Sequence, residues 1–125
     1  MTREHFEELV ERALERLPDQ FTNRIDNVRI VVEDYPSEET AGGRKLRRES
    51  LLGLYQGVPL PQRNTWYGTA PTAPDTITLF QKNIERICGT DAEVERQVAV
   101  TLFHELGHYF GMNEAEVRAA LRDFV

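Results

Sequence analysis

Hydrophobic residues recur every three or four positions near the start of the chain, which is the spacing of one face of a helix. The positions on this face are Phe6, Leu9, Val10, Ala13, Leu14 and Leu17. Thr2 precedes them and can accept a hydrogen bond from an unpaired backbone amide, while Pro18 follows them and ends the pattern. The pattern therefore predicts an N-terminal amphipathic helix.

Three later stretches are rich in the β-branched and aromatic residues that are typical of strands. They are NVRIVVEDYP from Asn27, SLLGLYQGVPLP from Ser50, and a third strand over about Thr76–Gln81 in DTITLFQKNIE. The polar, glycine-bearing residues 37–50 separate the first two strands and predict a surface loop.

A second amphipathic helix is predicted after Thr90, and it can run to Phe110. Thr90 and Glu93 have the spacing of a capping box, in which each side chain satisfies an unpaired backbone donor. Gly111 suits the left-handed residue just past a helix end. A broad apolar arc then predicts a largely buried central helix, formed by Val94, Val98, Ala99, Leu102, Phe103, Leu106, Tyr109 and Phe110.

A last short helix follows, with Asn113 as its cap. Its inward-facing positions are Val117, Ala120, Leu121 and Phe124. A helix, three strands and two helices in this order predict an α+β fold. The length of 125 residues predicts a single domain, 1–125.

The overall composition is that of a globular chain, because 40% of the residues are hydrophobic and 29% are charged. A net charge of −6 argues against nucleic acid or a membrane surface as partner. The single cysteine, Cys88, fits a reducing compartment. No apolar stretch has membrane-spanning length, and the N-terminus lacks the apolar centre of a secretory signal. We therefore expect a cytoplasmic protein, with a monomer as the default state.

Two histidines lie one turn apart on the predicted central helix, His104 and His108, with Glu105 between them. Their side chains project from the side that carries Gln97 and Thr101, away from the apolar arc. Two imidazoles placed in this way can bind one divalent ion. Glu105 would stand beside the ion and accept a proton from a water that the ion activates. This is the H-E-x-x-H arrangement.

A catalytic zinc site normally takes three protein ligands and leaves one position open. Gly111 lets the chain turn after the helix, and Glu114, six residues after His108, is correctly spaced to swing back. The resulting H-E-x-x-H-x-x-G-x-x-E pattern follows the metzincin layout, with glutamate in place of the third histidine. Glu116 is a rival ligand, but a helix capped by Asn113 would make it the capping partner.

Beyond this motif, the chain resembles a family of small bacterial proteins, the minimal zincin-like domains, which are considered possible zinc metallopeptidases. The resemblance covers NVRIVVEDYP, LLGLYQGVPLPQR, DTITLFQKNIERICGTDAEV and TLFHELGHYFGMNEAEV. It implies a small mixed sheet of about three to four strands, packed on the central helix between N- and C-terminal helices. The third ligand in that family is usually aspartate, so Glu114 is longer by one methylene. The methionine turn of the large metzincin proteases is missing, because the only methionines are Met1 and Met112.

The resemblance also suggests where a substrate binds, because an edge strand before the active-site helix of zincins pairs with extended peptides. The stretch TITLF stands in that position. Its backbone is therefore the candidate peptide-binding edge, at Thr76, Ile77, Thr78, Leu79 and Phe80. An ordinary strand, with Ile77 and Leu79 on one face and an alternating partner face, explains the same pattern at least as well.

Two lesser features have ordinary explanations as well. Tyr55, Trp66 and Tyr67 could line the cleft or donate to an oxyanion, but aromatic residues more often serve packing. The basic segment Gly43–Arg48 could contact an acidic partner or RNA, but a solvated loop explains it in an acidic chain.

Three functions remain open on the sequence alone. The first is a zinc peptidase that acts on a peptide or protein substrate, with His104, His108 and Glu114 as ligands and Glu105 as general base. The second is a metal-dependent hydrolase acting on RNA. Small bacterial RNA-processing proteins share a similar spacing but have glycine at the position of Glu105, so this glutamate favours a peptide substrate. The third is a non-catalytic, metal-binding interaction domain. Zinc suits these ligands best, although other first-row metal ions also bind imidazole and carboxylate.

Overall fold

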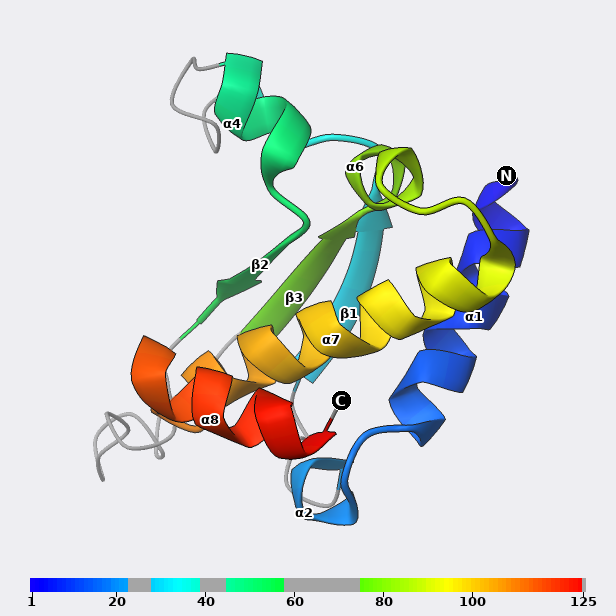
Figure 1. Cartoon of the computed structure of the whole chain (residues 1–125). Helices are drawn as coiled ribbons and strands as arrows, with labels where there is room; N and C mark the ends of the chain where they lie inside the picture. Colours follow the sequence, from blue (N-terminus) through cyan, green and yellow to red (C-terminus); the bar gives the residue numbers. More distant parts are fainter. Residues whose placement is uncertain (23–27, 39–44, 58–74, 125) are drawn as a thin grey trace.

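The computed structural model describes residues 1–22, 28–38, 45–57 and 75–124. Helices precede, separate and follow the strands along these parts of the chain (Figure 1). The elements are α1 (Arg3–Glu15), α2 (Asp19–Thr22), β1 (Val28–Glu33), α4 (Lys45–Ser50), β2 (Gly53–Gln56), β3 (Asp75–Phe80), α6 (Gln81–Arg86), α7 (Asp91–Tyr109) and α8 (Glu114–Phe124).

The strands form one mixed sheet in the order β1-β3-β2. β1 runs parallel to β3 and pairs with it along its whole length. β2 runs antiparallel to β3, with Gly53 opposite Leu79 and Gln56 opposite Thr76. The predicted α+β fold with a small mixed sheet is therefore confirmed.

The prediction that the third strand is an open edge is wrong. β3 is the middle strand of the sheet, so its neighbours β1 and β2 pair with both of its sides. The residues concerned are Thr76, Ile77, Thr78, Leu79 and Phe80. Ile77 and Leu79 are fully buried and Thr78 is only 7% exposed, which is the burial expected of a strand with a neighbouring strand on each side. Among the described strands, the edge that lies against α7 is β2.

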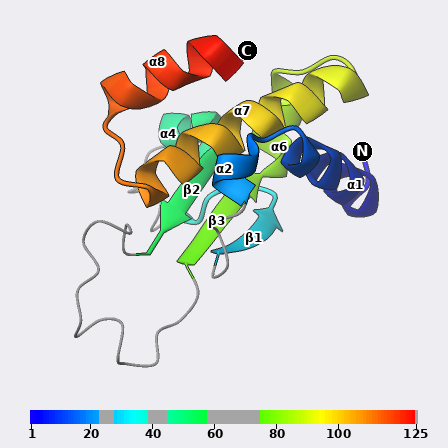
Figure 2. The same cartoon turned by 90° about the horizontal axis from the view of Figure 1, so that it is seen from below.

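Helix α7 crosses one face of the sheet, and α1 packs beside it (Figure 1). Figure 2 shows α1, α7 and α8 on the same side of the sheet, with α8 on the outer side of α7. The interior between these layers consists mainly of Phe6, Leu9, Val10, Ala13, Ile77, Leu79, Ile84, Val94, Val98, Leu102 and Leu106. The apolar arcs predicted for the first and central helices therefore form the core.

The predicted helix ends are confirmed. Thr2 accepts a hydrogen bond from the His5 amide, and Thr90 accepts one from the Glu93 amide at 3.1 Å. The Glu93 carboxylate accepts from the amide of Gly89 at 2.7 Å, one residue earlier than an ideal capping box has it. The central helix ends just before Gly111, whose φ of +83° lies in the left-handed region.

Two short helices replace parts that the sequence pattern predicts as loop and strand. Residues Lys45–Ser50 form α4 inside the predicted loop, and Gln81 begins α6 instead of ending the third strand. The buried Asn83 of α6 joins these regions, because its amide donates to the carbonyls of Arg48 and Leu51, both at 2.7 Å. Trp66 and Tyr67 lie outside the described residues.

Helix α8 approaches α7 closely at Gly107. A Cβ atom on this glycine would lie 2.6 Å from Cγ2 of Val117, which is fully buried. Because Val117 is β-branched, its side chain has little freedom to move aside. The absence of a side chain at Gly107 therefore sets the distance between the two helices.

We expect Gly107→Ala to lower the free energy of unfolding by about 1–3 kcal/mol, because overpacking must displace Val117. The direction of the change in stability distinguishes a packed position from an open one, because alanine in place of glycine at an open helix position would stabilise the protein by about 1 kcal/mol. The control is Gly89→Ala, whose Cβ atom would meet only the Glu93 carboxylate at 3.7 Å. Urea denaturation followed by circular dichroism measures both, and equal stability of the two variants would contradict the packing argument.

Candidate metal centre

The two histidines of the motif lie on the C-terminal half of α7, at the border of the core. The side chains of His104 and His108 are 33% and 34% exposed. Their ring centroids are 4.8 Å apart, with the ring planes at 85° to each other. The structure thus places both imidazoles on one side of α7, as the helical spacing predicts.

The carboxylate of Glu114 lies against both rings. Its Oε2 is 3.1 Å from Nε2 of His104, and its Oε1 is 3.2 Å from Nε2 of His108. Gly111 makes this return possible, because its left-handed backbone ends α7 and its amide donates to the carbonyl of His108. The chain then enters α8, of which Glu114 is the first residue.

These three side chains suit one zinc ion. Two imidazole nitrogens and a carboxylate oxygen are a donor set that zinc accepts. Tetrahedral ligands at about 2.0–2.1 Å from zinc stand about 3.3 Å from one another. The separations of 3.1 and 3.2 Å between the Nε2 atoms and the carboxylate are close to that value.

The same contacts hold the Glu114 carboxylate in its ionised form. A hydrogen bond from His104 is the main cause that lowers the pKa of Glu114, and the charges of His104, His108 and Arg118 add to it. An ionised carboxylate is the form that binds a metal ion.

Glu116, the rival ligand, is the capping partner of the last helix. Its amide donates to Oδ1 of Asn113 at 2.8 Å, and its carboxylate accepts from the Asn113 amide at 3.1 Å. This reciprocal pair is a capping box. The side chain of Glu116 therefore serves the start of α8.

Glu105 lies near the other nitrogen of His104. One of its carboxylate oxygens is 3.9 Å from Nδ1 of His104, whereas Glu114 lies against Nε2. His104, His108 and Glu105 offer donor atoms within 4.8 Å of one another. Both Nε2 atoms face Glu114, so the geometry favours Glu114 as the third ligand and Glu105 as a neighbour of the candidate metal centre.

Glu105 is largely shielded from solvent. Its side chain is only 12% exposed, and this burial raises its pKa to about 7. The neighbouring charge of Glu114 also raises the pKa, while His104 and a hydrogen bond from the backbone amide of Tyr55 lower it. Glu105 is thus a buried carboxyl group that is fixed to strand β2.

Strand β2 can reach Glu105 because residue 53 is glycine. A Cβ atom on Gly53 would lie 2.7 Å from Cγ2 of Thr101 and 3.7 Å from Cγ of Glu105. The sequence reasoning missed this contact, although an isolated glycine in a strand pattern is a sign of close backbone approach.

The side chain of Tyr55 serves packing. Its hydroxyl donates to the buried Asp75 at 3.0 Å, and its ring packs edge-on against Tyr109. It is the backbone amide of Tyr55 that contacts the site, through Glu105.

In this chain a helix with two histidines covers a mixed sheet, and a turn at a glycine brings a carboxylate back to the histidines. This is the arrangement of a zincin-type domain. A family model described as zincin-like metallopeptidase matches residues 25–122, and the chain belongs to this family. A solved structure of a conserved hypothetical protein from Thermo thermophilus is similar, with a TM-score of 0.53 and 26% identity. The match covers 98% of this chain and 100% of that one. No curated protein matches the chain.

The described helices also bear on membrane association. Over residues 1–22, 28–38, 45–57 and 75–124, no helix combines the length and the apolar character needed to cross a membrane.

We expect Glu114→Gln to weaken zinc binding by more than about tenfold, because even residues that only support a ligand contribute ten- to a hundredfold. The matched control is Glu116→Gln, which removes the same charge two residues away but keeps an oxygen that accepts from the Asn113 amide, so it should keep wild-type affinity. Competition with a chromophoric chelator measures both constants. Equal affinities of the two variants would show that Glu114 is not a ligand.

Proposed function

We propose that the protein is a zinc-dependent peptidase. The observation that carries the proposal is the convergence of two histidine Nε2 atoms on the Glu114 carboxylate, with the buried Glu105 beside them. Membership of the zincin-like metallopeptidase family supports the same reaction class.

In this proposal His104, His108 and Glu114 hold the ion. Zinc, when bound, polarises a peptide carbonyl and makes water acidic enough to attack it near neutral pH. The two imidazoles bind as neutral rings, and the ionised Glu114 partly balances the charge of the ion.

Glu105 serves as the general base. Its carboxylate accepts a proton from the attacking water, whose oxygen forms a bond to the carbonyl carbon. It then gives that proton to the amide nitrogen as the carbon–nitrogen bond breaks. The hydrogen bond from the Tyr55 amide orients the carboxylate, and the close contact at Gly53 keeps β2 in place for it.

Strand β2 takes over the substrate-binding role that the sequence suggested for β3. The amide of Phe80 donates to the carbonyl of Leu52 at 3.0 Å. The backbone N–H and C=O groups of Leu52 therefore face β3. Backbone groups alternate along a strand, so those of Gly53 and Tyr55 face away from β3. The Tyr55 amide already donates to Glu105, so an extended peptide that pairs with this side of β2 at Gly53 would lie next to Glu105.

We expect Glu105→Gln to lower the rate of zinc-dependent peptide hydrolysis by about 10²–10⁴-fold, which is the usual contribution of a general base. Zinc content should stay at the wild-type value, because Glu105 is not a ligand. Mass spectrometry of a mixed peptide pool, with chelator and after zinc is restored, measures the turnover. The control is Glu95→Gln on the same helix, a surface residue that pairs with Arg16.

Equal turnover by Glu105→Gln and the wild type would refute the peptidase proposal. Zinc-dependent cleavage of RNA without cleavage of peptides would favour the RNA hydrolase. If Glu105→Gln and the wild type support the same cellular role, the protein acts as an interaction domain.

A further inference from the structure

A cavity of about 270 Å³ opens directly beside the candidate metal centre. One of its walls is made by His104 and Glu105, and the other walls are mainly apolar, with Leu51, Leu52, Val100 and Leu121. Apolar cavities of roughly 150 Å³ hold a benzene molecule. This cavity therefore has room for a large apolar side chain such as that of leucine or phenylalanine.

The apolar walls come from separate elements that are held in place. Leu51 and Leu52 precede β2, and the carbonyl of Leu51 accepts a hydrogen bond from the buried Asn83. Val100 belongs to α7, and Leu121 belongs to α8, whose distance from α7 is set at Gly107. The apolar walls are thus tied to the rest of the fold by contacts that do not involve a ligand.

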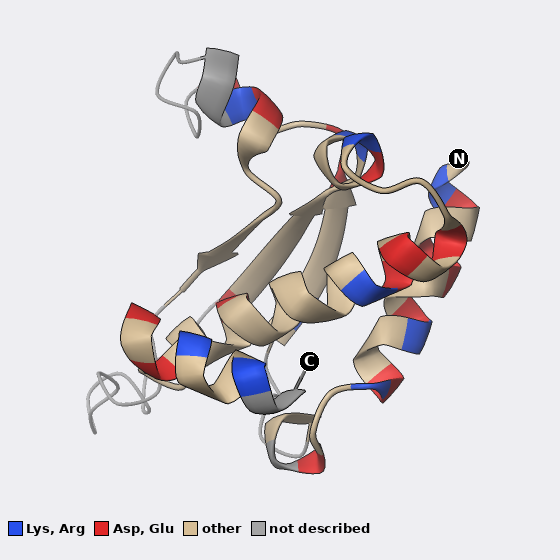
Figure 3. Ribbon diagram, in the orientation of Figure 1, with Lys and Arg blue, Asp and Glu red and all other residues tan. Residues whose placement is uncertain are grey.

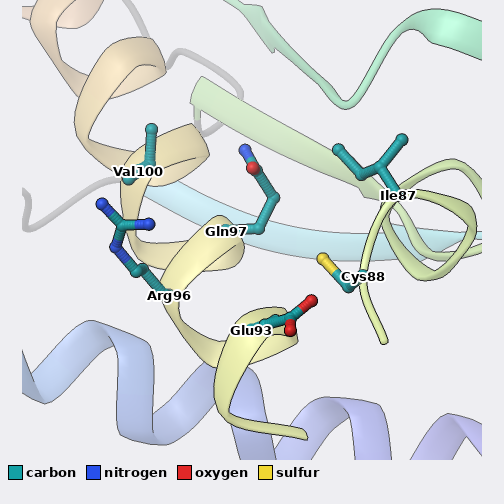
Figure 4. A pocket seen from close by; sticks show the side chains of 6 residues that line it. All are labelled: Ile87, Cys88, Glu93, Arg96, Gln97 and Val100. Carbon is teal, nitrogen blue, oxygen red and sulfur yellow. The ribbon is translucent and has the colours of Figure 1, made fainter. Parts of the chain in front are cut away.

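Two further hollows continue the cavity along α7, since they share residues with it. On one side, Gln97 and Val100 also line a hollow of about 410 Å³ that reaches Ile87 and Cys88. Figure 4 shows Gln97 between Val100 and these two residues. On the other side, Leu121 also lines a hollow of about 580 Å³ on α8. The site cavity thus shares lining residues with both of the other hollows, and we call the three together the groove.

The end of the groove on α8 carries positive charge. Arg118 and Arg122 line it, one helical turn apart, and both are exposed. Within the described part of the chain, neither side chain forms a hydrogen bond or a close ion pair, although the charge of Arg118 also acts on Glu114. Figure 3 shows the basic positions of α8 in blue, following one another along the helix. Like charges at this spacing repel each other, and a bound anion would relieve that repulsion. The pair is thus a local positive site on a protein whose net charge is −6.

We infer that the groove selects peptides that carry a large apolar side chain beside the scissile bond and a carboxylate toward α8. The apolar side chain occupies the cavity next to Glu105, and Arg118 and Arg122 bind the carboxylate. This preference rests on the proposed function and adds the substrate class to it. The carboxylate comes either from an acidic side chain or from the C-terminus of the peptide.

The test is peptide binding to the zinc-loaded Glu105→Gln variant, measured by fluorescence anisotropy so that no turnover is needed. Labelled octapeptides of glycine and serine carry one central leucine or alanine, with aspartate or asparagine two residues to either side. A further pair has a free or an amidated C-terminus. We expect leucine to bind about tenfold or more tightly than alanine. We expect a carboxylate to improve binding roughly three- to tenfold at low salt.

Substitutions in the groove locate the effect. Val100→Trp fills the cavity and should abolish the advantage of leucine over alanine. Arg118→Glu, and separately Arg122→Glu, should remove the advantage of the carboxylate. Arg12→Glu makes the same change of charge on the exposed face of α1 and should leave all the affinity ratios as they are.

Equal binding of the leucine and alanine peptides, or of peptides with and without a carboxylate, overturns the inference even if the wild type hydrolyses peptides. An unchanged ratio in the groove variants overturns it as well. Selective binding that responds to these variants supports it, even where the wild type cleaves none of the peptides. In that last case the groove stands as a peptide-binding site, and the mixed-pool assay decides the peptidase function separately.

Discussion

The close approach of two neighbours to helix α7 is the constraint on which the site depends. β2 reaches the helix at Gly53 and α8 reaches it at Gly107, and a Cβ atom on either glycine would lie under 3 Å from its neighbour. Since α7 carries His104, Glu105 and His108, these two contacts determine which groups of β2 and α8 lie beside those three side chains. β2 brings a backbone amide to Glu105, and α8 begins with Glu114 beside both histidines. The site is therefore assembled by backbone packing.

The two carboxylates on either side of His104 have opposite environments. Glu105 is buried against β2, and desolvation raises its pKa to about 7. Glu114 is exposed, and the nearby histidines lower its pKa. Environments that move the pKa values of two neighbouring groups apart suit them to different roles. In the proposed peptidase, this difference matches an ionised ligand on one side of His104 and a proton acceptor on the other.

The sequence pattern predicted the parts of the fold that local rules determine. Helical periodicity and the caps at Thr90 and Asn113 identified the central and last helices, and the glycine spacing predicted the return of Glu114. Strand order was beyond this reasoning, because the residues of TITLF suit an edge or a middle position equally. The short helix α6 was missed, since its place depends on long-range hydrogen bonds from Asn83. Pairing between distant segments is not encoded in either segment alone.

The longer carboxylate at position 114 is compatible with a complete site because the start of α8 is fixed independently of any metal. Asn113 and Glu116 cap that helix, and Val117 anchors it against Gly107. From this fixed backbone, the Glu114 side chain already lies against the Nε2 atoms of both histidines. The extra methylene relative to aspartate is thus taken up by the side chain and requires no movement of the helix. Ligands that are positioned before binding reduce the entropy that binding costs. The capping box is therefore the feature that makes glutamate an effective third ligand in the proposed site.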